Sequence, residues 1–126
     1  MSPISLSEIL SRFILYRTNV RIDNSIRHAA FMPDRNGETS VFRTSEMSAN
    51  NIWNIGREVA RGRDKPLIGR ADIITAVVVS NGLQAVPQEP PEKHANIIGW
   101  SSEKSEQKEV ALILASEAIF RRNEAS

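Results

Sequence analysis

Two histidines, His28 and His94, carry the side chains of this sequence that most readily exchange protons near neutral pH. Two imidazoles that converge on one phosphodiester can act as general base and general acid, while a guanidinium holds the phosphate. Each histidine follows a cationic residue, Arg27 or Lys93, and each precedes a predicted strand. Arg43 lies on a predicted strand between them in the chain. His28, Arg43 and His94 are therefore the candidate catalytic set, although ordinary loop and strand-edge positions are the simpler explanation of both histidines.

The histidine contexts His28-Ala-Ala and His94-Ala-Asn resemble the paired His-x-Thr/Ser boxes of two-histidine phosphoesterases. That family has a phosphate-binding hydroxyl at the third position, where this chain has Ala30 and Asn96. The segment 41–44, Val-Phe-Arg-Thr, resembles a nucleotide-binding box of some ADP-ribosyltransferases, but no Ser-Thr-Ser strand accompanies it. Neither resemblance extends beyond four residues, so the chain is not assigned to either family.

Arginine dominates the cationic residues of the first half of the chain. Residues 1–70 carry eleven Lys or Arg against seven Asp or Glu, whereas residues 71–126 carry five against eight. A guanidinium binds phosphates and carboxylates through two parallel hydrogen bonds, so this bias predicts a face that recognises anions. Pairing of the arginines with internal acids is the alternative. The candidate binding residues are Arg17, Arg27, Arg70, Asn96 and Trp100.

The composition narrows the classes of function. The chain has no cysteine, which excludes disulfides and thiolate sites and fits a reducing cytoplasm. No cluster of metal ligands and no phosphate-binding glycine loop is present, so we expect no metal and no cofactor. The N-terminal residues lack the pattern of a secretory signal, and the apolar run 73–79 is too short to span a bilayer.

Two readings of function follow. The first is a small soluble binding module whose partner is an acidic protein surface, a nucleotide or RNA, and not a membrane. The alternative is a metal-independent phosphodiesterase or ribonuclease-like enzyme that uses His28 and His94. A homo-oligomer with a structural role is a third option, and the sequence leaves open whether the protein is an enzyme.

Length and pattern predict one α+β domain over residues 1–122, with a frayed tail over 123–126. We expect about five short strands in an antiparallel or mixed sheet, at 12–17, 29–33, 40–44, 83–87 and 95–100. We expect three helices, near 48–61, 71–81 and 102–121. The segment 71–81 is ambiguous, because its β-branched residues favour a strand while Asn81-Gly82 fits either a hairpin or a helix end.

Local signals define some helix ends. Ser5 and Glu8 match a capping box and predict a short N-terminal helix. Ser45 or Ser48 is suited to cap the helix near 48–61, and Gly62 is suited to follow the last turn of that helix. In the C-terminal helix, one apolar stripe should pack on the sheet; its main members are Val110, Leu114 and Ala118.

Overall fold

The computed structural model of the chain describes residues 2–124. Its centre is a six-stranded antiparallel sheet with the strand order β4-β5-β2-β1-β3-β6. The strands are β1 (Ile9–Ile14), β2 (Thr39–Arg43), β3 (Gly69–Ile74), β4 (Gln84–Pro87), β5 (His94–Ile98) and β6 (Ile119–Arg122). The helices are α1 (Ala49–Arg63), α2 (Thr75–Ser80) and α3 (Lys104–Glu117), with short 3-10 helices η1 (Arg17–Asn19) and η2 (His28–Ala30). The predicted α+β class is confirmed, with six strands.

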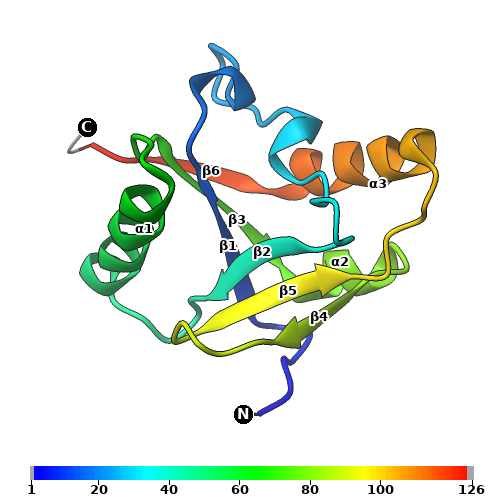
Figure 1. Cartoon of the computed structure of the whole chain (residues 1–126), viewed down its shortest axis with the longest axis horizontal. Helices are drawn as coiled ribbons and strands as arrows, with labels where there is room; N and C mark the ends of the chain where they lie inside the picture. The colour runs from blue at the N-terminus through cyan, green and yellow to red at the C-terminus, as the bar shows by residue number, and fades with distance from the viewer. Residues whose placement is uncertain (1, 125–126) are drawn as a thin grey trace.

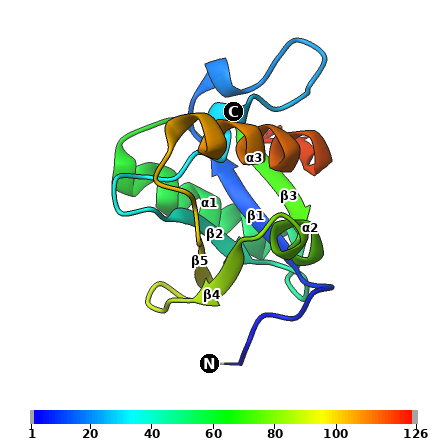
Figure 2. The ribbon, with the colours of Figure 1, turned by 90° about the vertical axis from the view of Figure 1, so that its right-hand side faces the viewer.

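The helices cover both faces of the sheet. α1 lies on one face, and α2, α3 and η2 lie on the other (Figure 1). Figure 2 shows α2 and α3 in front of β1 and β3, with α1 behind them. Within residues 2–124, no helix combines the length and the apolar character needed to cross a membrane.

Side-chain alternation along β1 divides the core in two. Leu10 and Ile14 belong to the cluster beneath α2, α3 and η2. Phe13 and Leu15 belong to a second cluster, which packs beneath α1. Successive residues of a strand point to opposite faces, so one strand supplies both cores.

Helix α1 begins where the sequence predicts and ends later. Ser48 is its N-cap, and its hydroxyl accepts a hydrogen bond from the backbone N–H of Asn51 at 3.2 Å. Gly62 lies inside the helix, which closes at Asp64 in the left-handed conformation with φ 53°. Gly56 faces Phe13 of the sheet, where a side chain would not fit.

The ambiguous segment 71–81 is half strand and half helix. Residues up to Ile74 belong to β3, which pairs with β1 along its whole length. The chain turns at Thr75, whose N–H and hydroxyl both donate to the carbonyl of Glu8 at 2.9 Å. The predicted helix is therefore wrong for residues 71–74 and confirmed for 75–80. Pairing with β1 is a non-local interaction that overrides the local helical signal.

The predicted helix 102–121 also divides. α3 ends at Glu117, and residues 119–122 form the edge strand β6 on β3. Close approach of the two strands depends on Gly69, since a Cβ there would lie 2.6 Å from the ring of Phe120. The predicted apolar stripe is confirmed: Leu114 is fully buried and Val110 partly buried on α3, and Ala118, which follows the last residue of the helix, is also partly buried.

Two further segments differ from the prediction. Residues 29–33 form η2 and a turn instead of a strand, because side chains of other segments use their carbonyls: Arg12 donates to Ala30 and Thr39 to Phe31. The Glu8 carboxylate accepts from the backbone N–H of Ser5, as in a capping box, but the Glu8 N–H donates to the Ser5 carbonyl and closes a single turn that leads straight into β1.

The expected tail begins at Asn123. Its backbone N–H donates to the carbonyl of Ile68 at 3.0 Å and its side-chain amide to the carbonyl of Leu67 at 3.1 Å. This residue is therefore bound to the segment that immediately precedes β3. Positions 125 and 126 of the expected tail lie outside the described residues.

Candidate functional site

The structure does not bring His28 and His94 together. His28 opens η2, which packs against α3 on one face of the sheet. The ring of His94 stands on the other face, where it contacts Phe42 edge-on at 5.2 Å between centroids. Phe42 belongs to the core cluster beneath α1. The pair therefore lacks a common cleft.

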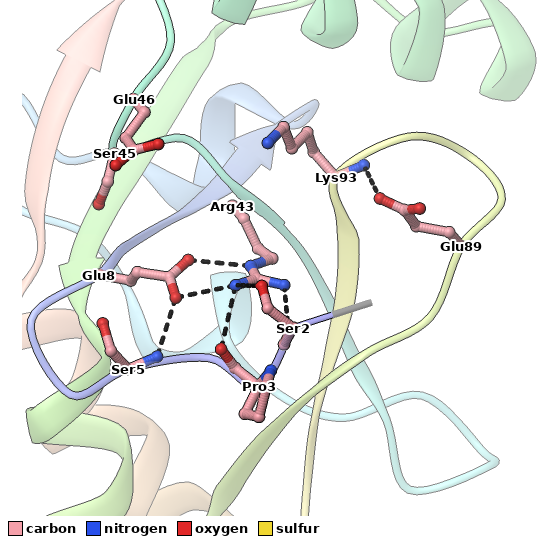
Figure 3. A pocket seen from close by; sticks show the side chains of 9 residues that line it. All are labelled: Ser2, Pro3, Ser5, Glu8, Arg43, Ser45, Glu46, Glu89 and Lys93. Carbon is pink, nitrogen blue, oxygen red and sulfur yellow. Dashed lines mark hydrogen bonds and ion pairs between the residues drawn. The ribbon is translucent and has the colours of Figure 1, made fainter.

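Arg43 fastens the N-terminal segment to the sheet. Its Nε and Nη2 each lie 2.9 Å from a carboxylate oxygen of Glu8, and its Nη1 donates to the carbonyl of Ser2 at 2.8 Å. Figure 3 shows this guanidinium enclosed by Glu8, Ser2 and Pro3. These hydrogen bonds lower the pKa of Glu8. Because the donors of Arg43 are occupied by the protein itself, few remain for a ligand.

Arg43 and Glu8 line a polar pocket of about 370 Å³ beside the N-terminal segment of the chain. The amino group of Lys93 extends into it, toward the side of Ser45 and Glu46 (Figure 3). Glu46 and Glu89 offset the charge of Lys93, so the pocket holds both signs. It is not a cationic site.

Three of the predicted binding residues make contacts within the fold. Arg70 is buried, donates to Asp72 at 3.2 Å and lies 4.6 Å from the ring centroid of Trp53. Asn96 is buried and donates its amide to the side chain of Gln88. Trp100 packs against the main core, and its indole nitrogen is buried without an acceptor in the described chain.

The other two predicted binding residues are at the surface. Arg17, in η1, and Arg27, just before η2, are both exposed. Within residues 2–124, neither side chain makes a hydrogen bond or an ion pair, so both guanidinium groups are available to a ligand.

A cavity lies where β1 and β2 separate. The two strands pair only at Leu10 with Arg43 and at Ser11 with Phe42, after which they diverge. The resulting cavity has a volume of about 130 Å³ and is bounded by η2 on one side and the end of α1 on the other. Its polar lining residues are Arg12, Tyr16, Asn19, Ser40 and Arg63.

Arg12 is the central cation of this cavity. Its Nε donates to Ala30 at 2.8 Å and its Nη1 to the carbonyl of Ser40 at 3.0 Å. Its Nη2 has no acceptor in the described part of the chain. Burial lowers the pKa of Arg12, and the positive charge of Arg63 lowers it further.

No carboxylate among residues 2–124 forms a salt bridge with Arg12 or Arg63. A partly buried arginine usually has an acidic partner, because desolvation of an unpaired charge is costly. The charges that act on Arg12 are the cation of Arg63, with the larger effect, and the carboxylate of Asp34, which forms no salt bridge with it. The cavity is therefore the part of the described structure that is best suited to receive an anion.

The sequence analysis did not single out Arg12, Ser40 or Arg63. A signal for Arg12 was present, since it alternates with Leu10 and Ile14 and so occupies an inward position on an apolar strand. No comparable signal marks Ser40 or Arg63, because they reach the cavity only through the placement of β2 and α1.

No protein-family model, no curated protein and no solved structure matches the chain. Among the described residues, no group of three or more His, Cys, Asp or Glu is arranged to hold a metal ion. The geometry of the chain is thus the basis for assigning a function.

Proposed function

We propose that the protein is a binding module that recognises an anionic group in the cavity between β1 and β2. The convergence of Arg12 and Arg63 on this cavity, with no carboxylate among residues 2–124 at salt-bridge distance from either, carries the proposal. A volume of about 130 Å³ suits one compact group, such as a phosphate or a carboxylate. The rest of the ligand would lie outside, on the surrounding surface.

That surface is rich in cations. Arg122, at the end of β6, donates to Asn24, and Lys65, just after α1, lies over the ring of Tyr16. Both contacts connect these segments to the part of the chain that follows β1. These segments carry several cations: Arg17, Arg27, Arg63, Lys65 and Arg122. Asp23 and Asp64 offset part of their charge. The net field would still favour an approaching anion.

This binding function favours a phosphate-bearing partner, a nucleotide or RNA, over an acidic protein. A phosphate accepts several hydrogen bonds from two guanidinium groups within a small volume. We place the protein in the cytoplasm on the ground of its cysteine-free sequence.

Binding of inorganic phosphate, ATP and a short single-stranded RNA, measured by calorimetry at low salt, tests this proposal. Arg63→Ala should weaken binding by about tenfold or more, the effect of losing one charge-assisted contact. Arg61→Ala is the matched control, because Arg61 lies on the same helix, is exposed and pairs with Glu58 outside the cavity.

Equal losses in the Arg63 and Arg61 variants would show that only net charge matters and would overturn the cavity as the site. Absence of binding to all three probes at low salt would overturn the phosphate-bearing ligand. RNA binding would be recognised by a steep decrease in affinity as salt is raised.

A further inference from the structure

A serine and a histidine meet on the face of the sheet that carries α1. Ser40 lies on β2 and His94 on the neighbouring strand β5, and Ser40 Oγ is 2.8 Å from His94 Nε2. On the other side of the ring, His94 Nδ1 is 2.8 Å from the carbonyl oxygen of Gln88. The ring is therefore held at both nitrogens.

These two contacts decide which nitrogen carries the proton in the neutral ring. The carbonyl of Gln88 can only accept, so Nδ1 must be the protonated nitrogen. Nε2 then has a free lone pair, and the hydroxyl of Ser40 donates to it. This is the tautomer in which a histidine can remove the proton of a serine nucleophile.

The group that orients the histidine is itself fixed. The backbone N–H of Gln88 donates to the carbonyl of His94 at 2.9 Å, and the Gln88 side chain accepts from Asn96. Phe42 holds the flank of the imidazole at an interplanar angle of 61°. The Gln88 carbonyl thus takes the orienting position that a carboxylate has in a serine–histidine–aspartate triad.

The serine borders the cavity that contains Arg12. Ser40 and Phe42 both line that cavity, and the Arg12 guanidinium donates to the carbonyl of Ser40 itself. Its Nη2 makes no hydrogen bond within residues 2–124. The Arg12 guanidinium thus adds positive charge beside the backbone of Ser40, which favours an anionic substrate in this cavity.

We infer that Ser40 and His94 are the nucleophile and general base of a site that hydrolyses small esters bearing a negative charge. The cavity limits the acyl group to a few non-hydrogen atoms. The preference for a charged ester rests on the proposed anion binding by Arg63, whereas the reactivity of Ser40 does not depend on it.

The reaction has two halves. In the first, the Ser40 proton passes to His94 Nε2 as Oγ bonds to the ester carbon, and the carbonyl oxygen becomes negative. The carbon–oxygen bond to the alcohol then breaks, and the alcohol takes the proton from Nε2. In the second half, water gives a proton to Nε2 as its oxygen bonds to the acyl carbon held by Ser40. The bond from that carbon to Oγ then breaks, which releases the carboxylic acid, and Nε2 returns the proton to Oγ.

Labelling with a small, uncharged fluorophosphonate tests the nucleophile directly. Its phosphorus forms a bond to an activated serine oxygen with loss of fluoride, and mass spectrometry locates the modified residue. We expect modification of Ser40 in the wild type and its loss in Ser40→Ala and His94→Gln. The exposed Ser105 provides the control variant Ser105→Ala, which should be modified as the wild type is. Melting curves identify any variant that does not fold.

Hydrolysis of the mono-4-nitrophenyl ester of succinic acid gives the second readout. Ser40→Ala and His94→Gln should each lower the rate by roughly a hundredfold or more, toward the uncatalysed rate. Arg63→Ala should reduce turnover of this charged ester. Labelling of Ser40 without phosphate binding would refute the proposed function alone. A folded wild type whose Ser40 stays unlabelled under excess reagent would overturn the inference.

Discussion

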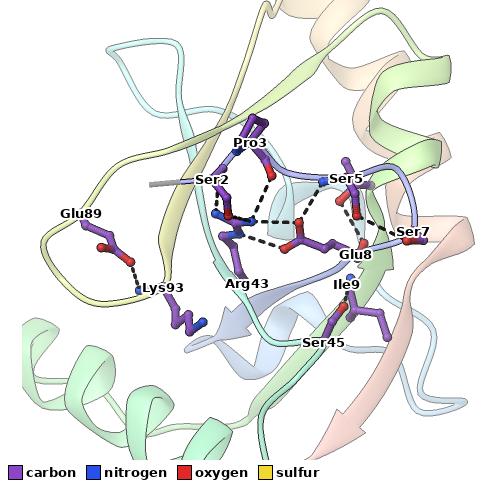
Figure 4. Close-up of polar contacts among 11 residues, drawn as sticks. Ser2, Pro3, Ser5, Ser7, Glu8, Ile9, Arg43, Ser45, Glu89 and Lys93 are labelled. Atoms are coloured by element: carbon purple, nitrogen blue, oxygen red, sulfur yellow. Dashed lines mark hydrogen bonds and ion pairs between the residues drawn. The ribbon is translucent and has the colours of Figure 1, made fainter.

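Glu8 and Arg43 form a two-pronged ion pair in which both carboxylate oxygens receive a guanidinium hydrogen bond at 2.9 Å (Figure 4). Glu8 directly precedes β1 and Arg43 ends β2, so the pair joins the start of the chain to the sheet. Both side chains are mostly shielded from water, at 20% and 16% exposure. The same arginine also holds Ser2 and Pro3 through their carbonyls.

This pair makes stability depend on pH. The pKa of Glu8 is lowered in the folded chain, mainly by its hydrogen bond with Arg43, so folding favours the charged carboxylate. The contribution of the Glu8 charge to stability is complete at pH values above the pKa of Glu8 in the unfolded chain, about 4.3. It is lost as pH falls through the lower pKa of Glu8 in the folded chain. Glu8→Gln should therefore lower the free energy of unfolding at pH 7 by about 1 kcal/mol, a value reduced for partial exposure.

Urea unfolding of wild type and Glu8→Gln from pH 7 down to pH 3 measures this contribution. The difference between the two proteins should shrink on acidification below about pH 4.3. A difference that stays constant with pH would contradict the role of the Glu8 charge.

Substitution of two glycines of α1 by alanine should change stability in opposite directions. A Cβ on Gly56 would lie 2.6 Å from the ring of Phe13 and 3.1 Å from Leu67, in a packed core, so Gly56→Ala should destabilise by about 1–3 kcal/mol. Gly62 has nothing within 4 Å of that position, so Gly62→Ala should stabilise by about 0.5–1 kcal/mol through helix propensity. Thermal unfolding compares the two, and equal shifts would contradict the packing of α1 on β1.

The leucines of α3 test the orientation of that helix. Leu114 is fully buried, and Leu114→Asp should cost about 4 kcal/mol or more because it buries an unpaired charge. Leu112 is 45% exposed on the same helix, so Leu112→Asp should change stability by no more than about 1 kcal/mol. Chemical denaturation measures both, and a Leu114→Asp variant as stable as the wild type would show that α3 does not pack through this stripe.

The sequence alone determined those features that depend on neighbours a few positions apart. The apolar stripe around Leu114 and the cap at Ser48 were predicted because helix contacts recur every three or four residues. The strands β2, β4 and β5 were predicted because alternation and turn residues are also local signals. Together these elements were enough for the α+β class.

The rest was decided by contacts between distant segments. Residues 71–74 and 119–122 are strands because β1 and β3 offer them unpaired edges, and the hydrogen bonds gained there outweigh weak helical preferences. Arg43, expected to meet a ligand, meets Glu8, 35 positions away. No local pattern encodes such a pairing.

The candidate site shows the same division most clearly. The sequence marked His94 as a reactive side chain and the arginines as anion binders. It did not reveal that Ser40, 54 positions away, would donate to His94, since that contact exists only when β2 and β5 pair in one register. Nor did it show that Arg12 and Arg63 would share a cavity, because β1 and β2 must first diverge and α1 must close over the opening. The sequence specifies which residue types are present, whereas strand register and helix packing determine the distances between them.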